Sequence, residues 1–168
     1  LLNRSSDLIR LYIYMTIEKV RDFLKGYGKD KYIREFDTSS ATVELAAEAL
    51  DVEPARIAKS LTFKNNEKCI MVVTAGDRKV DNRKFKNEFG IKAKMLSPDE
   101  VYEFTGHRVG GVCPFVIDLD KVQIYCDKSM ERFQTVFPAC GSSNSAIELT
   151  LDELFKLSNA LKWVDICK

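Results

Sequence analysis

Lys59 lies within the run Ile57-Ala58-Lys59-Ser60-Leu61-Thr62-Phe63, whose other side chains are apolar or carry a hydroxyl. An ammonium held in a cleft can neutralise a phosphate or stabilise negative charge that develops during a reaction. The alternative is a surface lysine whose stem covers apolar neighbours while its charge reaches water. The spacing leaves both interpretations open.

A glycine-rich loop is the second candidate for chemistry. It runs Gly106-His107-Arg108-Val109-Gly110-Gly111-Val112-Cys113-Pro114-Phe115. Two adjacent glycines let the backbone approach a ligand closely or present N–H groups to an anion, and Pro114 stiffens the exit of the loop. A plain tight turn is the alternative.

Two further segments are rich in hydroxyls, at residues 36–42 (FDTSSAT) and 139–145 (ACGSSNS). The first combines hydroxyls with free N–H groups at a helix start, which suits an anionic or hydroxyl-bearing ligand, although helix capping alone would also explain it. The second is either a turn between strands or part of a pocket near the lysine or the glycines.

Other catalytic arrangements have weaker support. Cys113 and His107 could form a thiol nucleophile and base, but no carboxylate stands near the histidine to orient it, and Val-Cys-Pro is typical of a small buried cysteine. With a single histidine and no C-x-x-C spacing, we expect no metal site. Neither G-x-G-x-x-G nor G-x-x-x-x-G-K-[ST] occurs, so we expect no nucleotide cofactor.

The composition describes one ordinary domain. The 168 residues carry 26 Lys plus Arg against 25 Asp plus Glu, a net charge of +1, whereas a protein that wraps many phosphates is usually far more basic. A nucleic-acid partner would therefore be held by a local patch or at one end. No apolar run is long enough to span a bilayer, and five cysteines without a framework pattern favour reduced thiols, so we expect a soluble cytoplasmic protein.

Periodicity and capping signals predict the order of the elements: Ser39 or Ser40 can cap the helix at 41–50, Pro54 suits the first turn of a short helix, and capping boxes at Ser97 and Thr150 open two others. Residues 1–14 lack a signal-peptide pattern and are interpreted as a leader or cloning remnant, with the domain at 15–168. Hairpin-rich strands interrupted by helices favour an α+β or mixed sheet. Helices are expected at 16–26, 41–50, 55–60, 81–89, 97–106 and 150–161, and strands at 60–63, 69–74, 115–117, 122–126, 133–137 and 146–149.

In this order, the hydroxyl-rich helix start, IAKSLTF, GGVCPF and a Gly-Ser loop before AIELT resemble the YbaK/EbsC family, from about residue 15 to 163. That family shares its fold with the editing domain of bacterial prolyl-tRNA synthetases. The resemblance implies a single compact α+β domain (mixed α/β) with a barrel-like mixed sheet flanked by helices. It also implies hydrolysis of the ester that joins a wrong amino acid to the 3′ end of a tRNA.

By position, the resemblance implies that Lys59 contacts the terminal nucleotide and polar groups of the substrate. Ser60 matches a small hydroxyl residue beside that lysine, and Gly110 and Gly111 match the loop against the aminoacyl group. The remaining substrate-binding positions lie in the same motifs: Phe36, Thr38, Ser39, Ser40, Val112, Cys113, Pro114, Gly141, Ser142 and Ser143.

An aminoacyl ester is already activated, so a deacylase can work by placing a water and stabilising an oxyanion without a side-chain nucleophile. The expected partner is the 3′ acceptor end of a mischarged tRNA, with an aminoacyl-tRNA synthetase as a second candidate, and no membrane, metal or cofactor. Ala146 replaces an acidic residue of some members, and Cys113 replaces a common serine. The candidate amino acids are cysteine, alanine, serine, threonine or a small non-protein analogue, and the hydroxyl-rich lining favours a small or polar one.

Two other functions remain as alternatives. One is a non-catalytic module of the same fold that binds tRNA or a nucleotide. The other is a thiol hydrolase that uses Cys113.

Overall fold

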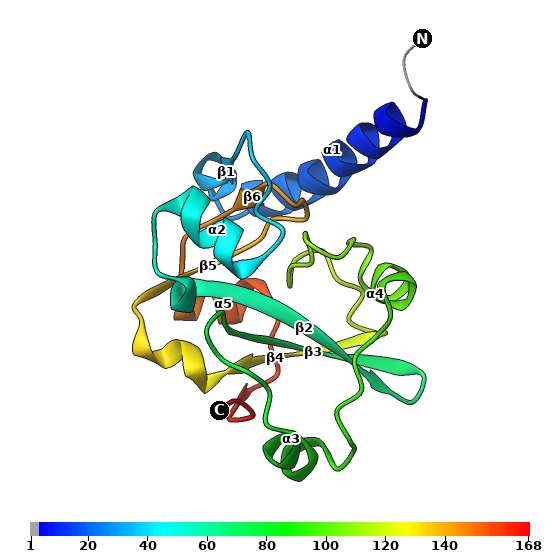
Figure 1. Ribbon diagram of the computed structural model, residues 1–168, viewed down its shortest axis with the longest axis vertical. Helices are drawn as coiled ribbons and strands as arrows, with labels where there is room; N and C mark the ends of the chain where they lie inside the picture. Colours follow the sequence, from blue (N-terminus) through cyan, green and yellow to red (C-terminus); the bar gives the residue numbers. More distant parts are fainter. Residues whose placement is uncertain (1–3) are drawn as a thin grey trace.

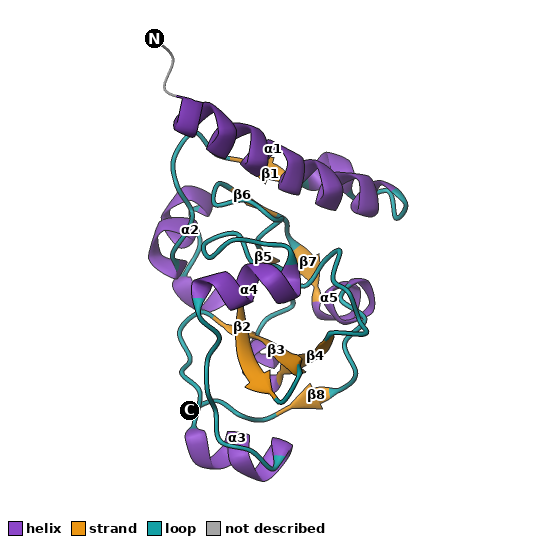
Figure 2. Ribbon diagram, turned by 90° about the vertical axis from the view of Figure 1, so that its right-hand side faces the viewer, coloured by secondary structure: helices purple, strands orange, loops and turns teal. Residues whose placement is uncertain are grey.

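The computed structural model describes residues 4–168 and has a mixed six-stranded sheet at its centre (Figures 1 and 2). The sheet curls into half a barrel, and helices flank it, which confirms the predicted fold class. Its order is β7-β5-β2-β3-β4-β8, with antiparallel pairs β2–β3 and β5–β7 and parallel pairs β2–β5, β3–β4 and β4–β8. The strands are β2 (Ile57–Asn65), β3 (Lys68–Ala75), β4 (Val122–Asp127), β5 (Thr135–Pro138), β7 (Leu149–Thr150) and β8 (Trp163–Val164).

The hairpin of β2 and β3 is the longest pairing in the sheet. Asn65 pairs with Lys68 around a two-residue turn, in which Asn66 takes a left-handed φ of 55°. Asparagine tolerates this conformation and is common in such turns. From Cys69 to Ala75 every residue of β3 is buried, which explains why its sequence is a continuous apolar run.

Five α-helices surround the sheet: α1 (Arg4–Lys25), α2 (Val43–Leu50), α3 (Asn82–Phe89), α4 (Pro98–Thr105) and α5 (Leu151–Leu157). Short 3-10 turns are η1 (Asp30–Tyr32), η2 (Pro54–Arg56) and η3 (Lys128–Arg132). The predicted capping boxes of α4 and α5 are confirmed. The N-cap of α2 is Thr42, which accepts a hydrogen bond from the Leu45 N–H, and not Ser39 or Ser40 as expected.

Helix α1 begins at Arg4, twelve residues before the predicted start at residue 16, and its first turns project from the body of the protein (Figure 1). Its second half buries Val20 and Leu24 in the main core. The interpretation of residues 1–14 as a leader or cloning remnant stays a prediction, and residues 1–3 lie outside the described part. No described helix combines the length and apolar character needed to cross a membrane.

Three other predictions of secondary structure were wrong. The helix expected at 55–60 is only the turn η2, and β2 already starts at Ile57. The strand expected at 115–117 is irregular, because Val116 has a positive φ of 57°. Residues 146–149 do not form one strand: β6 (Ser145–Ala146) pairs with β1 (Arg34–Glu35), while β7 pairs with β5. β1 and β8 were not predicted.

Four core clusters form among the described residues, and two of them join the sheet to α1, α3, α5 and the C-terminal segment. One contains Val20, Ala58, Phe115 and Ile147, with residues from α1 and α5. The other contains Phe63 and residues of α3 and the C-terminal segment. All five cysteines are buried and none forms a disulfide.

Candidate functional site

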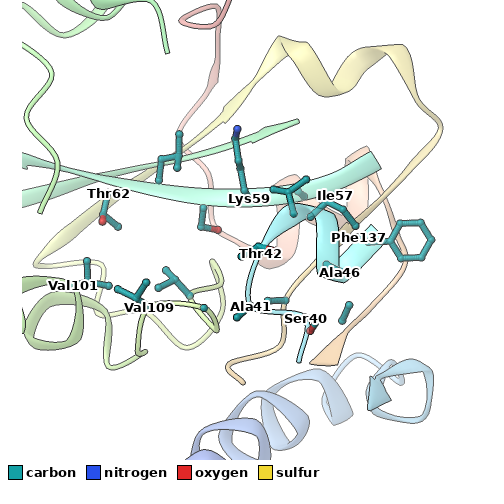
Figure 3. A pocket seen from close by; sticks show the side chains of 18 of the residues that line it. Ser40, Ala41, Thr42, Ala46, Ile57, Lys59, Thr62, Val101, Val109 and Phe137 are labelled. Carbon is teal, nitrogen blue, oxygen red and sulfur yellow. The ribbon is translucent and has the colours of Figure 1, made fainter. Parts of the chain in front are cut away.

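A cavity of about 380 Å³ lies along β2, between the segment that leads into α2 and the glycine-rich loop (Figure 3). Its walls are mostly apolar, with a few hydroxyls and one ionisable side chain, that of Lys59. The principal lining residues are Ser40, Ala41, Thr42, Ala46, Ile57, Lys59, Ser60, Thr62, Val101, Val109, Gly110, Val112, Phe137, Ser145 and Ala146. A concave, largely apolar site with a few convergent polar groups is typical of small-ligand binding.

Lys59 lies inside strand β2, where its side chain and that of Thr62 leave the strand in opposite directions (Figure 3). This follows from the alternation of side chains along a strand. The ammonium donates to the carbonyl oxygens of Gly76, at 3.1 Å, and Arg78. Burial lowers the pKa of Lys59, and the nearby Asp77 only partly opposes this effect. Lys59 is therefore a half-buried, positioned cation rather than a side chain extended into solvent.

Lys59 also joins the main cavity to a smaller one of about 270 Å³, which we call the basic cavity. It is lined by Lys59, Leu61, Phe63, Arg78, Lys79, Val80, Asn82, Ala93 and Met95. Lys59, Leu61 and Met95 line both cavities, so the two hollows meet at this part of β2.

The edge of β2 that faces the main cavity is partly open. Strand β5 pairs with only Ile57 and Ala58, and further along the Thr62 carbonyl accepts from the Leu96 N–H. Backbone groups of alternate residues point to the same side, so the N–H and C=O of Ser60 face this open edge between the two pairings. The Ser60 hydroxyl is also buried and has no hydrogen-bond partner among the described residues.

The glycine-rich loop fits tightly against the two hydroxyl-rich segments. Gly110 has a φ of 96°, and a β-carbon there would lie 3.0 Å from the Ala41 β-carbon. A β-carbon on Gly111 would come within 2.8 Å of the Ser142 carbonyl carbon. The loop can therefore lie this close only because these two positions lack side chains.

Hydrogen bonds tie the two hydroxyl-rich segments together. The Ser40 N–H donates to the Ser143 carbonyl, and the Phe36 N–H donates to the Asn144 carbonyl at 2.8 Å. The Ser142 hydroxyl donates to the Asn144 side chain at 2.9 Å and contacts the Ser145 hydroxyl at 2.6 Å. The Ser142 hydroxyl is thus engaged within its own loop.

The structure brings together some of the predicted site residues and separates others. Lys59, Ser60, Ser40, Gly110 and Val112 line the main cavity. Gly111, Gly141, Ser142 and Ser143 line another cavity, of about 430 Å³, across the glycine-rich loop. The other five predicted residues line neither of these two cavities: Phe36, Thr38, Ser39, Cys113 and Pro114.

Several cavity residues were missed by the sequence analysis. Thr62 follows Ser60 at the strand spacing of two, so the strand expected at 60–63 already indicated that both face the same side. Phe137 and Ala146 arrive from β5 and β6, and no local sequence signal places them beside β2.

Cys113 and His107 are close, with 3.5 Å between Sγ and Nε2, yet both are buried. The same Nε2 lies 2.9 Å from the Phe115 carbonyl oxygen. A carbonyl only accepts, so Nε2 carries the proton and cannot also accept one from the thiol. With the proton on Nε2, the imidazole cannot act as the base for the Cys113 thiol.

Within residues 4–168, no group of three or more His, Cys, Asp or Glu is arranged to hold a metal ion. The chemistry of the main cavity therefore has to be argued from Lys59, hydroxyls and backbone groups.

Comparisons with known proteins agree with this fold. The family model described as the aminoacyl-tRNA editing domain matches residues 37–157, and these residues include every segment that lines the main cavity. The chain belongs to the aminoacyl-tRNA editing domain family.

Individual relatives fall into two groups. The chain is 52% identical to "Uncharacterized protein YwhH" of Bacillus subtilis (strain 168), over 92% of this chain and 98% of that protein. It is 31% identical to a proline–tRNA ligase of Thermotoga maritima, over 67% of this chain but only 20% of that enzyme. The chain thus spans about a fifth of the length of that ligase.

A solved structure also matches almost end to end. It bears the name "Crystal structure of a putative trans-editing enzyme for prolyl tRNA synthetase" and superposes with a TM-score of 0.81 at 26% identity. The match covers 91% of this chain and 97% of that one.

Proposed function

We propose that this protein is a deacylase that acts in trans on mischarged tRNA and hydrolyses the ester of a small amino acid. The observation that carries the proposal is the main cavity along β2, which Lys59, Ser60 and Gly110 all line. The Ser60 hydroxyl has no hydrogen-bond partner among the described residues, and the Lys59 ammonium is held by the Gly76 and Arg78 carbonyls on the side of β2 opposite to Thr62 (Figure 3). The cavity volume of about 380 Å³ suits a terminal adenosine with a small acyl group. Membership of the editing family and the likeness to a trans-editing structure support the reaction class.

The lining of the main cavity favours positioning over covalent catalysis. It includes no His, Cys, Asp or Glu among its described residues, so no side chain there is a ready nucleophile or general base. An aminoacyl ester needs only a placed water and stabilisation of the oxyanion that forms. A vicinal hydroxyl of the terminal ribose or a backbone carbonyl would orient the water, and the water's proton passes to the departing ribose oxygen as the ester C–O bond breaks.

Specific groups are available for each role. The Ser60 N–H and hydroxyl and the Gly110 backbone would hold the ester, while the Ser60 carbonyl at the open strand edge would orient the attacking water. Lys59 would supply positive charge beside the terminal nucleotide, because its ammonium is fixed by the Gly76 and Arg78 carbonyls. In this scheme Lys59 steadies charge and does not transfer a proton.

A small acyl group fits the apolar end of the main cavity, where Ala46, Ile57, Phe137 and Ala146 come together. Such walls distinguish acyl groups by size, with each methylene worth about 10- to 200-fold in rate. We therefore expect esters of alanine, serine, cysteine or threonine to be hydrolysed faster than those of large amino acids.

A deacylation screen tests the proposal. Wild type and Lys59→Ala are incubated with tRNAs charged with small and large amino acids, and release of the amino acid is followed over the spontaneous rate. Lys64→Ala is the matched control, because Lys64 lies on the same strand but outside the main cavity. We expect rapid release by wild type and Lys64→Ala and loss of at least 100-fold in Lys59→Ala. Equal release by all three proteins, or by none, would contradict the proposal.

A further inference from the structure

The charged residues are distributed unevenly along the chain. Residues 78–94 contain seven Lys and Arg and two acidic residues, a net charge of +5, although the whole chain has a net charge of only +1. The rest of the protein is therefore acidic overall, with a net charge of −4. The positive charge of residues 78–94 is therefore not apparent from the net charge of the whole chain.

Much of this charge is exposed and not neutralised. Within the described residues, five side chains of the segment are exposed and form no ion pair: Lys79, Arg83, Lys86, Lys92 and Lys94. Only Arg78 and Lys84 have an acidic partner there, at Asp77 and Asp165. The stretch from Glu18 to Glu35 is less basic, because its six Lys and Arg stand beside four acidic residues and three of them, Arg21, Lys29 and Arg34, are paired with a glutamate.

The segment surrounds the basic cavity. Arg78, Lys79 and Asn82 line that cavity, and so does Ala93, which lies between Lys92 and Lys94 in the sequence. The basic cavity meets the main cavity at Lys59, Leu61 and Met95. A chain of phosphates that leaves the main cavity at Lys59 would therefore meet the basic segment next.

We infer that the phosphates of the tRNA acceptor stem lie along residues 78–94, so the RNA leaves the main cavity over α3 and not across the glycine-rich loop toward α1. The inference rests on the proposed function and names where its substrate is held. Lysines that contact phosphates release counterions, which gives an affinity that falls steeply with salt. The nearly neutral whole chain still holds RNA, because the charge is concentrated beside the site.

Binding of total uncharged tRNA, measured between 50 and 200 mM KCl, tests this path. The test variant is Lys79→Gln/Lys92→Gln/Lys94→Gln, and the matched control is Lys19→Gln/Lys25→Gln/Lys31→Gln, which removes three exposed lysines from α1 and η1. We expect the test variant to bind tRNA roughly 10- to 100-fold more weakly than wild type. The slope of log K against log[salt], which is negative, should become shallower by about 2 to 3 units. The control is expected to bind like wild type.

Two outcomes would overturn the inference: tRNA binding by the test variant that matches wild type, or an equal loss in the control. Melting temperatures show whether each variant is folded, and Arg83→Gln/Lys86→Gln on α3 is a second test if the triple variant is not. Because the tRNA carries no amino acid, a protein that binds it over α3 but hydrolyses no ester would refute the proposed function and leave this inference standing.

Discussion

Gly111 packs so closely on Ser142 that a β-carbon on the glycine would lie 2.8 Å from the serine carbonyl carbon and 3.0 Å from its nitrogen. Both contacts are to backbone, which cannot move aside as the end of a side chain can. The position of the glycine-rich loop, and with it the wall of the main cavity, depends on this contact.

Gly111→Ala should therefore displace the loop and lower the free energy of unfolding by about 1 to 3 kcal/mol, as other overpacked substitutions do. Deacylation should fall with it, because the neighbouring Gly110 lines the main cavity. Gly26→Ala is the control, since a β-carbon there meets only the Phe23 carbonyl oxygen at 3.4 Å. Urea unfolding measures the stability of both variants, and single-turnover deacylation measures their activity. Equal stability and activity of Gly111→Ala and Gly26→Ala would refute the role of Gly111 in positioning the loop.

Ser60→Ala separates function from stability. The Ser60 hydroxyl is buried without a partner among the described residues, and such a group costs about 1 to 3 kcal/mol. Its removal should leave the free energy of unfolding unchanged or slightly higher, while kcat/KM for deacylation falls about tenfold. A loss of stability with full activity would show that the hydroxyl has a purely structural role.

Thr74→Val is the matched control for Ser60→Ala. The Thr74 hydroxyl is also buried without a described partner, but Thr74 does not line the main cavity. This variant should likewise keep or gain stability, and its kcat/KM should equal that of wild type.

The lowered pKa of Lys59 predicts a pH dependence. Burial moves the pKa of this ammonium below the ordinary 10.5, so a step that needs the cation should slow as the pH rises through a value under 10.5. Between that value and 10.5 the unfolded chain binds more protons than the folded one, so the free energy of unfolding should rise with pH.

The pH profile of kcat/KM from 7 to about 10, corrected for spontaneous hydrolysis, measures this effect. Lys59→Arg keeps its charge throughout that range and should lose the alkaline decline, at a lower absolute rate. An identical decline in Lys59→Arg would assign the titration to another group.

Cys113→Ala should retain most of the deacylase activity. His107 Nε2 is committed to the Phe115 carbonyl and cannot take the thiol proton, and Cys113 is buried outside the main cavity. Loss of a buried side chain should cost about 1 to 2 kcal/mol of stability, measured by thermal unfolding. Complete inactivation of a folded variant would instead support the thiol hydrolase.

Local signals explain which parts of the fold were predictable from the sequence. The capping boxes at Ser97 and Thr150 fixed two helix starts, because each cap is made within four residues. Pro54 misled, since proline suits the first turn of a 3-10 turn as well as of a helix, and here only one turn forms. Val116 has a left-handed backbone conformation that a β-branched residue rarely adopts, so no sequence signal announced it.

The candidate site was predictable in its segments but not in its details. Lys59, Ser60 and Gly110 do line the main cavity. Gly111 and Ser142, which contact each other, line the cavity across the glycine-rich loop instead. The orientation of the Lys59 ammonium could not be foreseen, because the carbonyls that hold it belong to a loop beyond β3. Long-range pairings such as β1 with β6 involve two residues each and leave no periodic pattern.

A crystal structure of the protein with 3′-alanylamino-3′-deoxyadenosine, whose amide replaces the labile ester, tests the central claim most directly. We expect the alanyl group in the main cavity beside Ser60 and Gly110, and the nucleoside close to Lys59. Density for the analogue only in the cavity lined by Ser142 and Ser143, or away from β2, would contradict it.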